Sequence, residues 1–533
     1  MKPFSLVKIL SPLLVLPVIC CSSNTAKTDD PKEDIPQEWR KPVPFKNLLG
    51  VNAFEWDFLE SPDHKHPKNQ IFEPRMANIM AFGGIRHYLD WEKLEPEEGE
   101  YTFNPSRNGN WYYDVMYERC KKDSIAVLAC IKQCPPWLVN TYPENMRNAE
   151  NVPAPYGLDR TDPASYVAQA KMAFQFAARY GYNTNIDPEL VSVSEKARWT
   201  GDDVNQKKTG LQLIKYIECD NERDKWWRGK QAEQSPEEYA ANMSAFYDGH
   251  KGALGKNAGV KTADPNMLVV MGGLAKANVD YVRRMVNWCK ANRGTKPDGS
   301  VDLCFDVINY HLYSNDAGSQ QHGQSSHGMS PENSAAAQTA DDFIRFAHEE
   351  ANASPVWITE AGYDIHPKSP LRALAIGKKT AILTQADWLI RSSLLYARHG
   401  IERVFYFMLD DVNTTDATQF SSSGFVFNER RRPSADYFMQ AKKVLGDFTY
   451  KNTISQNPLV DVYESGNKTI YVLTLATQND KSINYTLDLA GAQSAEKLEL
   501  QPGSADMKKT QVKTAQGKLQ VSVSETPVFI RKN

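Results

Sequence analysis

Short apolar runs alternate with longer amphipathic segments over most of the chain, between residues 46 and 445. The short runs are rich in Val and Ile, which is typical of buried strands, and the apolar residues of the longer segments recur every three or four positions, which indicates helices. The predicted strands are Leu48–Ala53, Gly84–Tyr88, Ile125–Cys130, Leu213–Cys219, Leu268–Gly272, Val307–Leu312, Val356–Thr359 and Val404–Leu409. The clearest predicted helices are Ala164–Tyr180, Pro236–Leu254, Val279–Lys290, Ala340–Glu350 and Ala381–His399.

Eight strands that alternate with helices predict an α/β fold whose parallel sheet closes into a (β/α)8 barrel. The alternative is an open, doubly wound sheet, which a Gly-rich phosphate-binding turn after the first strand would favour. The segment after Ala53 reads FEWDFLESP and has no such turn. The pattern therefore favours the barrel.

Two long connections depart from the regular alternation. Residues 183–210 precede the fourth predicted strand, and residues 314–338, rich in Ser, Gln, Gly and His, follow the sixth. The second leaves the carboxyl end of a strand, where barrel active sites lie, so it either walls a cleft or is a tolerated surface insertion. We expect His322 and His327 within it to be solvated rather than metal ligands.

The helical pattern stops near residue 446. Beyond it Ile483, Tyr485 and Leu487 alternate with polar residues, as do Leu519 and Val521, and Gly-Asn and Pro-Gly pairs punctuate the runs. This period of two predicts a small antiparallel β-sandwich over residues 446–533. Its role is either to bind glycan or to pack against the barrel, and the pattern favours packing.

The chain begins with features of an export signal. Positive charge at Lys2 and Lys8 precedes an apolar stretch of about eleven residues, whereas a bilayer span needs roughly 20. The stretch ends at Cys20-Cys21, which resembles the lipobox of bacterial lipoproteins, although plain secretion with incidental cysteines is the alternative. We therefore predict a signal peptide over residues 1–21 with lipidation at Cys20 or Cys21, and a polar, Pro-punctuated linker over 22–45. The protein would be a periplasmic or cell-surface lipoprotein that meets the membrane only through this lipid anchor.

The amino-acid composition excludes some classes of function. The 533 residues are 41% hydrophobic and 24% charged, as in an ordinary globular protein. The formal net charge is −3, so there is no basic surplus to neutralise a phosphate backbone, and nucleic acid is not an expected partner. The six later cysteines do not show the paired spacing of a zinc site and do not fix a disulfide pattern.

Two carboxylates end predicted strands on opposite sides of the barrel. Glu222 follows the fourth strand, directly after Asn221, and Glu360 ends the seventh in PVWITE. Hydrolysis of a sugar acetal with retained configuration needs one carboxylic acid to protonate the leaving oxygen and one carboxylate to attack the anomeric carbon, roughly 5 Å apart. A single Glu at a strand end is more often a structural cap, so the assignment depends on the surrounding sequence.

Several surrounding segments, in the right order, resemble the clan A retaining glycoside hydrolases, including the cellulase- and mannanase-like and the xylosidase- and iduronidase-like branches. The resemblance covers the barrel, about 400 residues. It rests on Asn221-Glu222, Thr359-Glu360, GIRHYLDWEKLEPEEGEYTF (84–103), QCPPWL (133–138), INYHLY (308–313) and FVFNERRRPSADYF (425–438).

The resemblance implies roles for individual residues. Glu222 would be the general acid/base and Glu360 the nucleophile. Arg86 would lower the pKa of the nucleophile. Tyr313 would donate a hydrogen bond to the nucleophile, and His311 would line the catalytic subsite. No metal and no organic cofactor is required by this mechanism.

Further residues would contact the carbohydrate substrate. Asn221 would hold the sugar 2-hydroxyl, and Tyr406 would take the place of the Trp that the clan usually puts under the catalytic sugar. Trp137, Trp226 and Trp227 follow strand ends and either stack on sugar rings or belong to the core. Trp137 is the first choice for stacking.

The sequence also departs from the clan. Asp220 precedes Asn221-Glu222 where Trp or Gly is common, and Arg223 follows where Pro is frequent. These departures leave the substrate and branch open. A second hypothesis is a non-catalytic glycan-binding lipoprotein on a decayed barrel, which the presence of both Glu222 and Glu360 disfavours.

Overall fold

Eight parallel strands form one sheet in the computed structural model, which describes residues 35–318 and 325–532. The sheet order is β5-β4-β3-β2-β1-β8-β7-β6, and isolated parallel bridges join β5 to β6 and nearly close the ring. The strands are β1 Gly50–Ala53, β2 Gly84–Asp90, β3 Ala126–Lys132, β4 Tyr216–Cys219, β5 Leu268–Met271, β6 Ile308–His311, β7 Val356–Glu360 and β8 Arg403–Tyr406. The predicted α/β barrel and its eight strands are confirmed.

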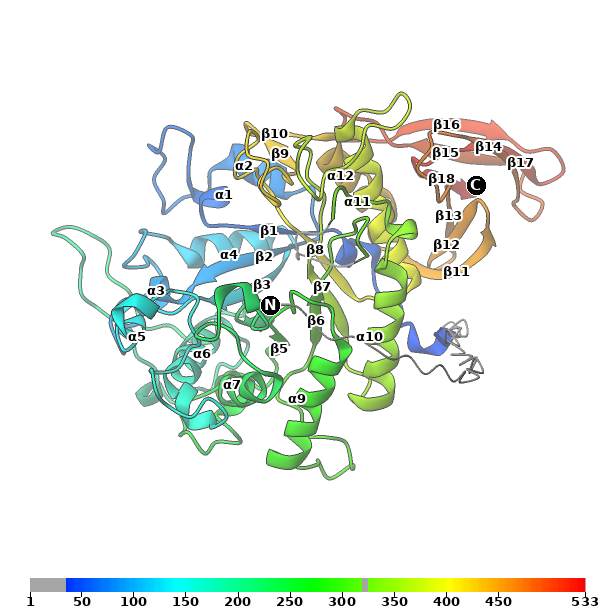
Figure 1. Cartoon of the computed structure of the whole chain (residues 1–533). Helices are drawn as coiled ribbons and strands as arrows, with labels where there is room; N and C mark the ends of the chain where they lie inside the picture. Colours follow the sequence, from blue (N-terminus) through cyan, green and yellow to red (C-terminus); the bar gives the residue numbers. More distant parts are fainter. Residues whose placement is uncertain (1–34, 319–324, 533) are drawn as a thin grey trace, which may run out of the picture. The chain divides into compact units, whose positions relative to one another are not determined.

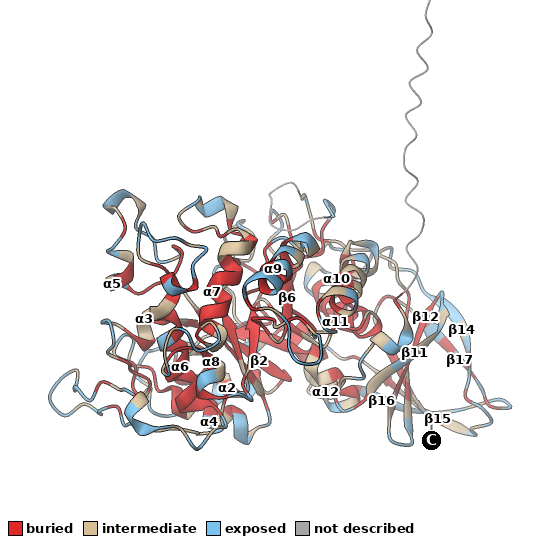
Figure 2. Ribbon diagram, turned by 90° about the horizontal axis from the view of Figure 1, so that it is seen from below, coloured by how far each residue is buried: buried red, intermediate tan, exposed pale blue. Residues whose placement is uncertain are grey.

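Helices lie around the barrel strands (Figure 1). The main helices are α2 Glu73–Ile79, α4 Tyr113–Lys122, α6 Val167–Tyr180, α7 Pro236–Asp248, α9 Val279–Asn292, α10 Ala336–Glu350, α11 Ala381–Arg398 and α12 Pro433–Leu445. Single-turn helices are α1 Trp56–Leu59, α3 Trp91–Leu94, α5 Pro136–Val139 and α8 Val260–Ala263. Buried residues concentrate in the strands and on the helix faces turned toward them (Figure 2).

Local chemistry fixes where α7 begins and ends. Ser235 and Glu238 form a reciprocal capping box at its amino end, which satisfies backbone N–H groups that have no partner within the helix. The helix ends at Asp248 because Gly249 takes a left-handed conformation with φ 63°. The prediction that this helix continues to Leu254 was therefore wrong, and the glycine is the reason.

Polar side chains lie above an apolar layer inside the barrel. The apolar cluster is formed by Leu128, Val270, Trp357 and Phe405 from four different strands and by Val307, which directly precedes β6. Fully buried Arg86, Glu218 and Asn309 come from β2, β4 and β6, and both Arg86 and Asn309 donate to the Glu218 carboxylate. Such a buried polar network is stable only when its members are mutually satisfied. It supports the side chains at the carboxyl ends of the strands.

The chain beyond the barrel forms antiparallel sheets, which confirms the predicted change to β structure. One sheet has the order β11-β12-β13-β18-β15-β16, and β14 pairs with β17 in a second. Inward-facing residues such as Leu487, Val521 and Ile530 share one apolar core between the sheets. The strands are β11 Thr449–Gln456, β12 Leu459–Ser465, β13 Lys468–Thr474, β14 Ile483–Asp488, β15 Ser494–Glu499, β16 Lys508–Lys513, β17 Lys518–Val523 and β18 Val528–Lys532.

The antiparallel sheets contact the barrel through helix α11. Arg398 Nη1 lies 2.6 Å from Asp461 Oδ2, and Arg391 donates to the carbonyl of Thr477. Arg398 and Asp461 are both buried, so the contact includes desolvated charge rather than only surface pairing. These contacts support the packing role predicted for the sandwich.

Some of the predictions concern residues that the structure does not describe. These residues are the predicted signal peptide with Cys20 and Cys21, most of the polar linker, and His322. Within the described part, His327 Nδ1 lies 2.8 Å from the carbonyl of Gly328. Among the helices that the structure describes, none combines the length and hydropathy of a membrane span.

Candidate active site

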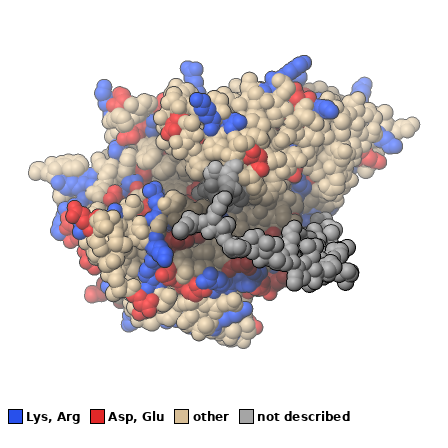
Figure 3. All heavy atoms as spheres, in the orientation of Figure 1, with Lys and Arg blue, Asp and Glu red and all other residues tan. Residues whose placement is uncertain are grey.

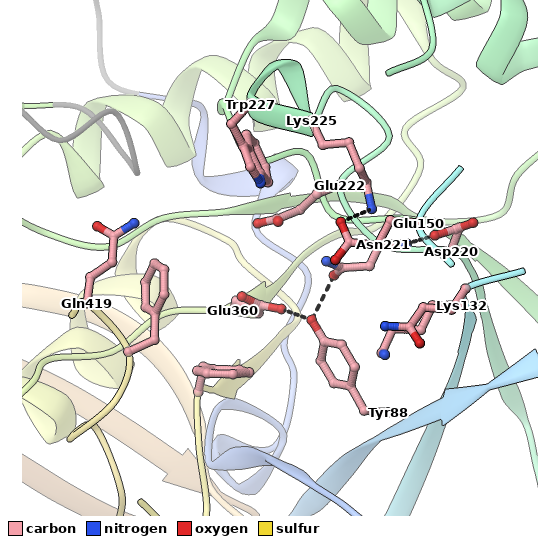
Figure 4. Close-up of a pocket in the computed structure, with 13 residues that line it drawn as sticks. Tyr88, Lys132, Glu150, Asp220, Asn221, Glu222, Lys225, Trp227, Glu360 and Gln419 are labelled. Carbon is pink, nitrogen blue, oxygen red and sulfur yellow. Dashed lines mark hydrogen bonds and ion pairs between the residues drawn. The ribbon is translucent and has the colours of Figure 1, made fainter. Parts of the chain in front are cut away.

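Both predicted carboxylates lie at one end of the barrel and face the same cavity. The cavity has a volume of ≈ 500 Å³ and includes Glu222, Glu360, Asn221 and Tyr88 in its lining. One carboxylate oxygen of Glu222 and one of Glu360 lie within 4.8 Å of each other. Figure 4 shows the two carboxyl groups turned toward each other across the cavity. Figure 3 shows a hollowed face on which acidic and basic side chains are interspersed.

Glu360 receives hydrogen bonds from three different side chains. Arg86 Nη1 donates to its Oε1 over 2.8 Å, Tyr88 donates to the same oxygen, and Tyr313 donates to Oε2 over 2.9 Å. Burial alone would raise the pKa of Glu360, but the charges of His311 and Arg86 and the two tyrosine hydroxyls outweigh it and lower that pKa. The carboxylate is therefore held ionised.

Arg86 is fully buried at the centre of a polar network. Its Nε and Nη2 donate to the two carboxylate oxygens of Glu218 over 2.6 and 2.9 Å. Its remaining donors reach Glu360, Asn52 Oδ1 at 3.1 Å and Asn221 Oδ1 at 2.8 Å. A planar guanidinium suits this arrangement because its donors diverge in fixed directions. Arg86 therefore forms ion pairs with both Glu218 and Glu360 and orients Asn221.

Glu222 is paired with a buried histidine. His311 Nδ1 lies 2.8 Å from Glu222 Oε1, and His311 Nε2 lies 3.0 Å from the hydroxyl oxygen of Thr359. Thr359 donates its own proton to Glu218, so its oxygen accepts the Nε2 proton. Burial alone would lower the pKa of His311, but the charges of Glu360 and Glu222 raise it. Nδ1 and Glu222 Oε1 must share at least one proton, because two lone pairs at this distance would repel.

The two departures at positions 220 and 223 stabilise the loop that carries Glu222. Arg223 Nη2 lies 3.0 Å from Asp220 Oδ2, and both side chains are buried. Arg223 also donates to the backbone carbonyls of Asn151 and Ala232. Glu222 itself has φ 51°, a left-handed conformation that costs a non-glycine residue free energy. A buried ion pair and its backbone contacts therefore hold the loop in this conformation.

The structure places Tyr406 away from the cavity, contrary to the predicted position under the sugar. It is fully buried at the end of β8, its hydroxyl lies 2.8 Å from Ser393 Oγ on α11, and its ring packs edge-on against Phe438. Phe407, the next residue, lines the cavity. Successive side chains of a strand point to opposite faces, so an alignment error of one residue reverses the direction.

Trp137 also lies outside the cavity lining. Its Nε1 donates to the carbonyl of Glu95 over 3.0 Å, and its ring packs edge-to-face on Trp91. The tryptophan that lines the cavity is Trp227, which is 43% exposed. The structure therefore corrects the choice of Trp137 as the first stacking residue.

Sequence reasoning did not single out several residues of the site. Tyr88 is two positions after Arg86 on β2, so the strand period alone places both on one face. Glu218 is a charged residue within a predicted buried strand, and such a charge requires a partner. Phe420 lines the cavity from the long connection after β8 and packs on Tyr313 with ring centroids 4.6 Å apart. No pattern in the sequence identifies Phe420.

Glu222, His311 and Glu360 are also the residues that could hold a metal ion. Among the described residues, one ligand atom from each comes within 4.8 Å of the others. The guanidinium of Arg86 already supplies positive charge 2.8 Å from Glu360, and a second cation on the same carboxylate would be repelled. The donor set therefore suits proton transfer better than metal binding.

No protein-family model matches the sequence, and no protein with a curated description is similar to it in sequence. Solved structures do share its fold. A family 39 glycoside hydrolase from the gut symbiont Bacteroides cellulosilyticus superposes with a TM-score of 0.59 at 15% identity, covering 94% of this chain and 82% of the other.

Two further structures extend this comparison. A family 30 endoxylanase from Clostridium papyrosolvens has a TM-score of 0.50 at 11% identity, covering 93% of this chain and 97% of the other. A family 51 α-L-arabinofuranosidase from Bifidobacterium longum has a TM-score of 0.50 at 13% identity, covering 93% and 98%. The chain has the fold of clan A glycoside hydrolases, the group that its barrel sequence resembles.

Proposed function

We propose that the protein is a retaining glycoside hydrolase that cleaves β-linked oligo- or polysaccharides by double displacement. The separation of the two carboxylates carries the proposal. One carboxylate oxygen of Glu222 and one of Glu360 lie within 4.8 Å of each other, which is compatible with the roughly 5 Å between the carboxyl groups of retaining enzymes. Inverting enzymes leave about 6.5–9.5 Å between the carboxyl groups, because a water molecule must fit behind the sugar.

In the first step Glu360 attacks the anomeric carbon and forms a covalent glycosyl ester. The bond from that carbon to the leaving oxygen breaks, and Glu222 gives its proton to this oxygen. In the second step Glu222 takes a proton from water, the water oxygen bonds to the anomeric carbon, and the ester bond to Glu360 breaks. The two inversions restore the original configuration.

The surrounding residues give the two carboxyl groups different hydrogen-bond environments. Arg86, Tyr88 and Tyr313 each donate to Glu360, which favours its ionised form and so suits a nucleophile. His311 shares a proton with Glu222, which suits an acid/base group. Two nearby carboxyl groups whose environments differ in this way are typical of a pair with divided acid and nucleophile roles.

Substitution of Glu222 by alanine, with azide rescue, tests the acid/base assignment. We expect Glu222→Ala to lose most hydrolysis of aryl glycosides with poor leaving groups, and azide to restore turnover of an activated aryl glycoside with a β-glycosyl azide as product. Glu150, another carboxylate of the cavity lining, provides the matched control. Glu150→Ala should show no azide acceleration. Absence of rescue in Glu222→Ala would remove Glu222 from the acid/base role.

We also propose that the enzyme works outside the cytoplasm, tethered by a lipid at Cys20 or Cys21. Support comes from the charged and apolar leader and the Cys pair that follows it. The mass of the mature amino-terminal peptide from cells tests this proposal. A diacylglyceryl-modified Cys supports it, and an unmodified amino terminus with the leader intact contradicts it.

A further inference from the structure

A second cavity is lined in part by residues that follow Glu222 in the chain. It has a volume of ≈ 380 Å³ and includes Asp224, Trp226, Lys276, Asn278 and Tyr281 in its lining. Two chain segments frame it, the loop that continues from Glu222 and the segment that follows β5. The mechanism proposed above uses none of the residues that line this cavity.

Two consecutive tryptophans line the two cavities, one in each. Trp226 and Trp227 belong to the 3-10 turn η6 (Trp226–Arg228), with ring centroids 4.7 Å apart and planes at 86°. Trp227 lines the active-site cavity, and Trp226 lines the second. Large aromatic rings combine apolar area with a polar N–H, and so suit the apolar C–H faces and hydroxyl groups of sugar rings. Each cavity therefore contains one such ring on the same short turn.

Hydrogen bonds and one cation–π contact fix the segment from Glu222 to Trp226 against the segment that follows β5. The Asp224 carboxylate accepts the backbone N–H groups of Ala275 and Lys276, both at 2.9 Å. The Glu222 backbone N–H donates to the carbonyl of Gly273 over 3.1 Å. The Lys276 ammonium lies 4.2 Å from the centre of the Trp226 ring, a cation–π contact that orients the ring. The geometry between Glu222 and the second cavity is thus fixed by the fold.

Trp227 lies on the side of the active-site cavity where the leaving group is expected. Glu222, as the acid, must contact the oxygen of the leaving group, whereas Asn221 and Tyr88 lie beside the nucleophile Glu360. Figure 4 shows Trp227 beside Glu222, on the side away from Tyr88. Because Trp226 and Trp227 are neighbours on one turn, a chain that extended from the cleaved bond past Trp227 would come next to Trp226.

We propose that this second cavity binds the sugar units of the substrate that follow the leaving-group sugar, with Trp226 as its stacking surface. The inference rests on the proposed function and names its substrate class: β-linked chains with at least two sugar units beyond the cleaved bond. Such an enzyme favours oligosaccharides and polysaccharides over disaccharides and aryl glycosides, whose leaving groups end before Trp226.

Chain-length dependence of the Trp226→Ala variant tests this inference. The values of kcat/KM are measured on xylo- and cello-oligosaccharides from the disaccharide to the hexasaccharide, and on the matching 4-nitrophenyl β-glycosides. The matched control is Trp199→Ala, which removes a tryptophan that is 55% exposed and lines neither cavity. We expect Trp226→Ala to lower the ratio of hexasaccharide to aryl-glycoside kcat/KM by about five- to tenfold. Trp199→Ala should leave the ratio unchanged.

Calorimetry separates failure of this inference from failure of the proposed function. In the inactive Glu360→Gln background, Trp226→Ala should weaken hexasaccharide binding by a similar factor and disaccharide binding less. If wild type hydrolyses no glycoside but the binding loss is found, the proposed function fails and the second site stands. An unchanged ratio, an equal loss on all substrates, or no hexasaccharide binding by the Glu360→Gln protein would each overturn the second site.

Discussion

Removal of one hydroxyl group beside the nucleophile should shift the acid side of the pH profile. Tyr88 donates to Glu360, and its hydroxyl also lies 3.0 Å from Asn221 Oδ1. Tyr88→Phe keeps the ring and removes one of the three side-chain donors to the carboxylate. Arg86 still neutralises Glu360 and still orients Asn221, so the fold and the charge balance are retained.

The size of the shift follows from the free energy of one hydrogen bond. A hydrogen bond to a charged group contributes about 1.5–3 kcal/mol net, and about 1.4 kcal/mol corresponds to one pH unit. The bond favours the ionised carboxylate, so its loss raises the pKa of Glu360, which the site now holds below its usual value. We therefore expect the acid limb to move upward by about 1 to 2 pH units.

The assay is the pH dependence of kcat/KM for an activated aryl glycoside, because this parameter reports groups of the free enzyme. Tyr406→Phe is the matched control. It removes the hydroxyl that contacts Ser393 on the outer side of β8, so the acid limb should stay in place. Coincident acid limbs for Tyr88→Phe and wild type would refute the argument that hydroxyl donors keep Glu360 ionised.

Three further predictions concern the proton shared by His311 and Glu222, the loop that carries Glu222, and the positive charge beside Glu360. His311→Asn should move the basic limb of kcat/KM to lower pH, because it removes an imidazole whose pKa the charges of Glu360 and Glu222 hold above its usual value. An unchanged basic limb would contradict the proton shared with Glu222. Arg223→Met should lower the free energy of unfolding, measured with urea, by about 3–5 kcal/mol because Asp220 is left buried without its counter-ion, and a loss within error of zero would refute this structural role. Dialysis against EDTA should leave kcat/KM unchanged, since Arg86 supplies the positive charge beside Glu360. A loss that added Mg²⁺, Ca²⁺ or Zn²⁺ restores would contradict this account.

The barrel could be predicted because its signal is repeated along the chain. Each buried strand requires a continuous apolar run, and each helix requires an apolar stripe, so all eight strands were found within a few residues of their ends. The end of α7 was missed because the apolar pattern continues past Gly249, whose left-handed backbone stops the helix. The backbone conformation of a single residue leaves no periodic pattern of apolar positions in the sequence.

The residues of the candidate site also differ in whether the sequence could predict them. Glu222 and Glu360 could be singled out because they are carboxylates that follow or end apolar strands, whereas Asn221 and His311 were assigned through the resemblance to clan A. The direction of Tyr406 was wrong because the end of β8 fixes register only to within one residue, and one residue reverses the face. Phe420 reaches the cavity through the tertiary position of a long connection, which no local pattern encodes.

Trapping of the covalent intermediate tests the central claim most directly. A 2-deoxy-2-fluoro glycoside with a good leaving group slows the second step more than it slows the first, so the glycosyl-enzyme accumulates. We predict a mass increase of one fluoroglycosyl unit, carried by the peptide that contains Glu360 and absent from the Glu360→Gln variant. A label on any other residue, or turnover of the natural substrate with inverted anomeric configuration, would contradict the account.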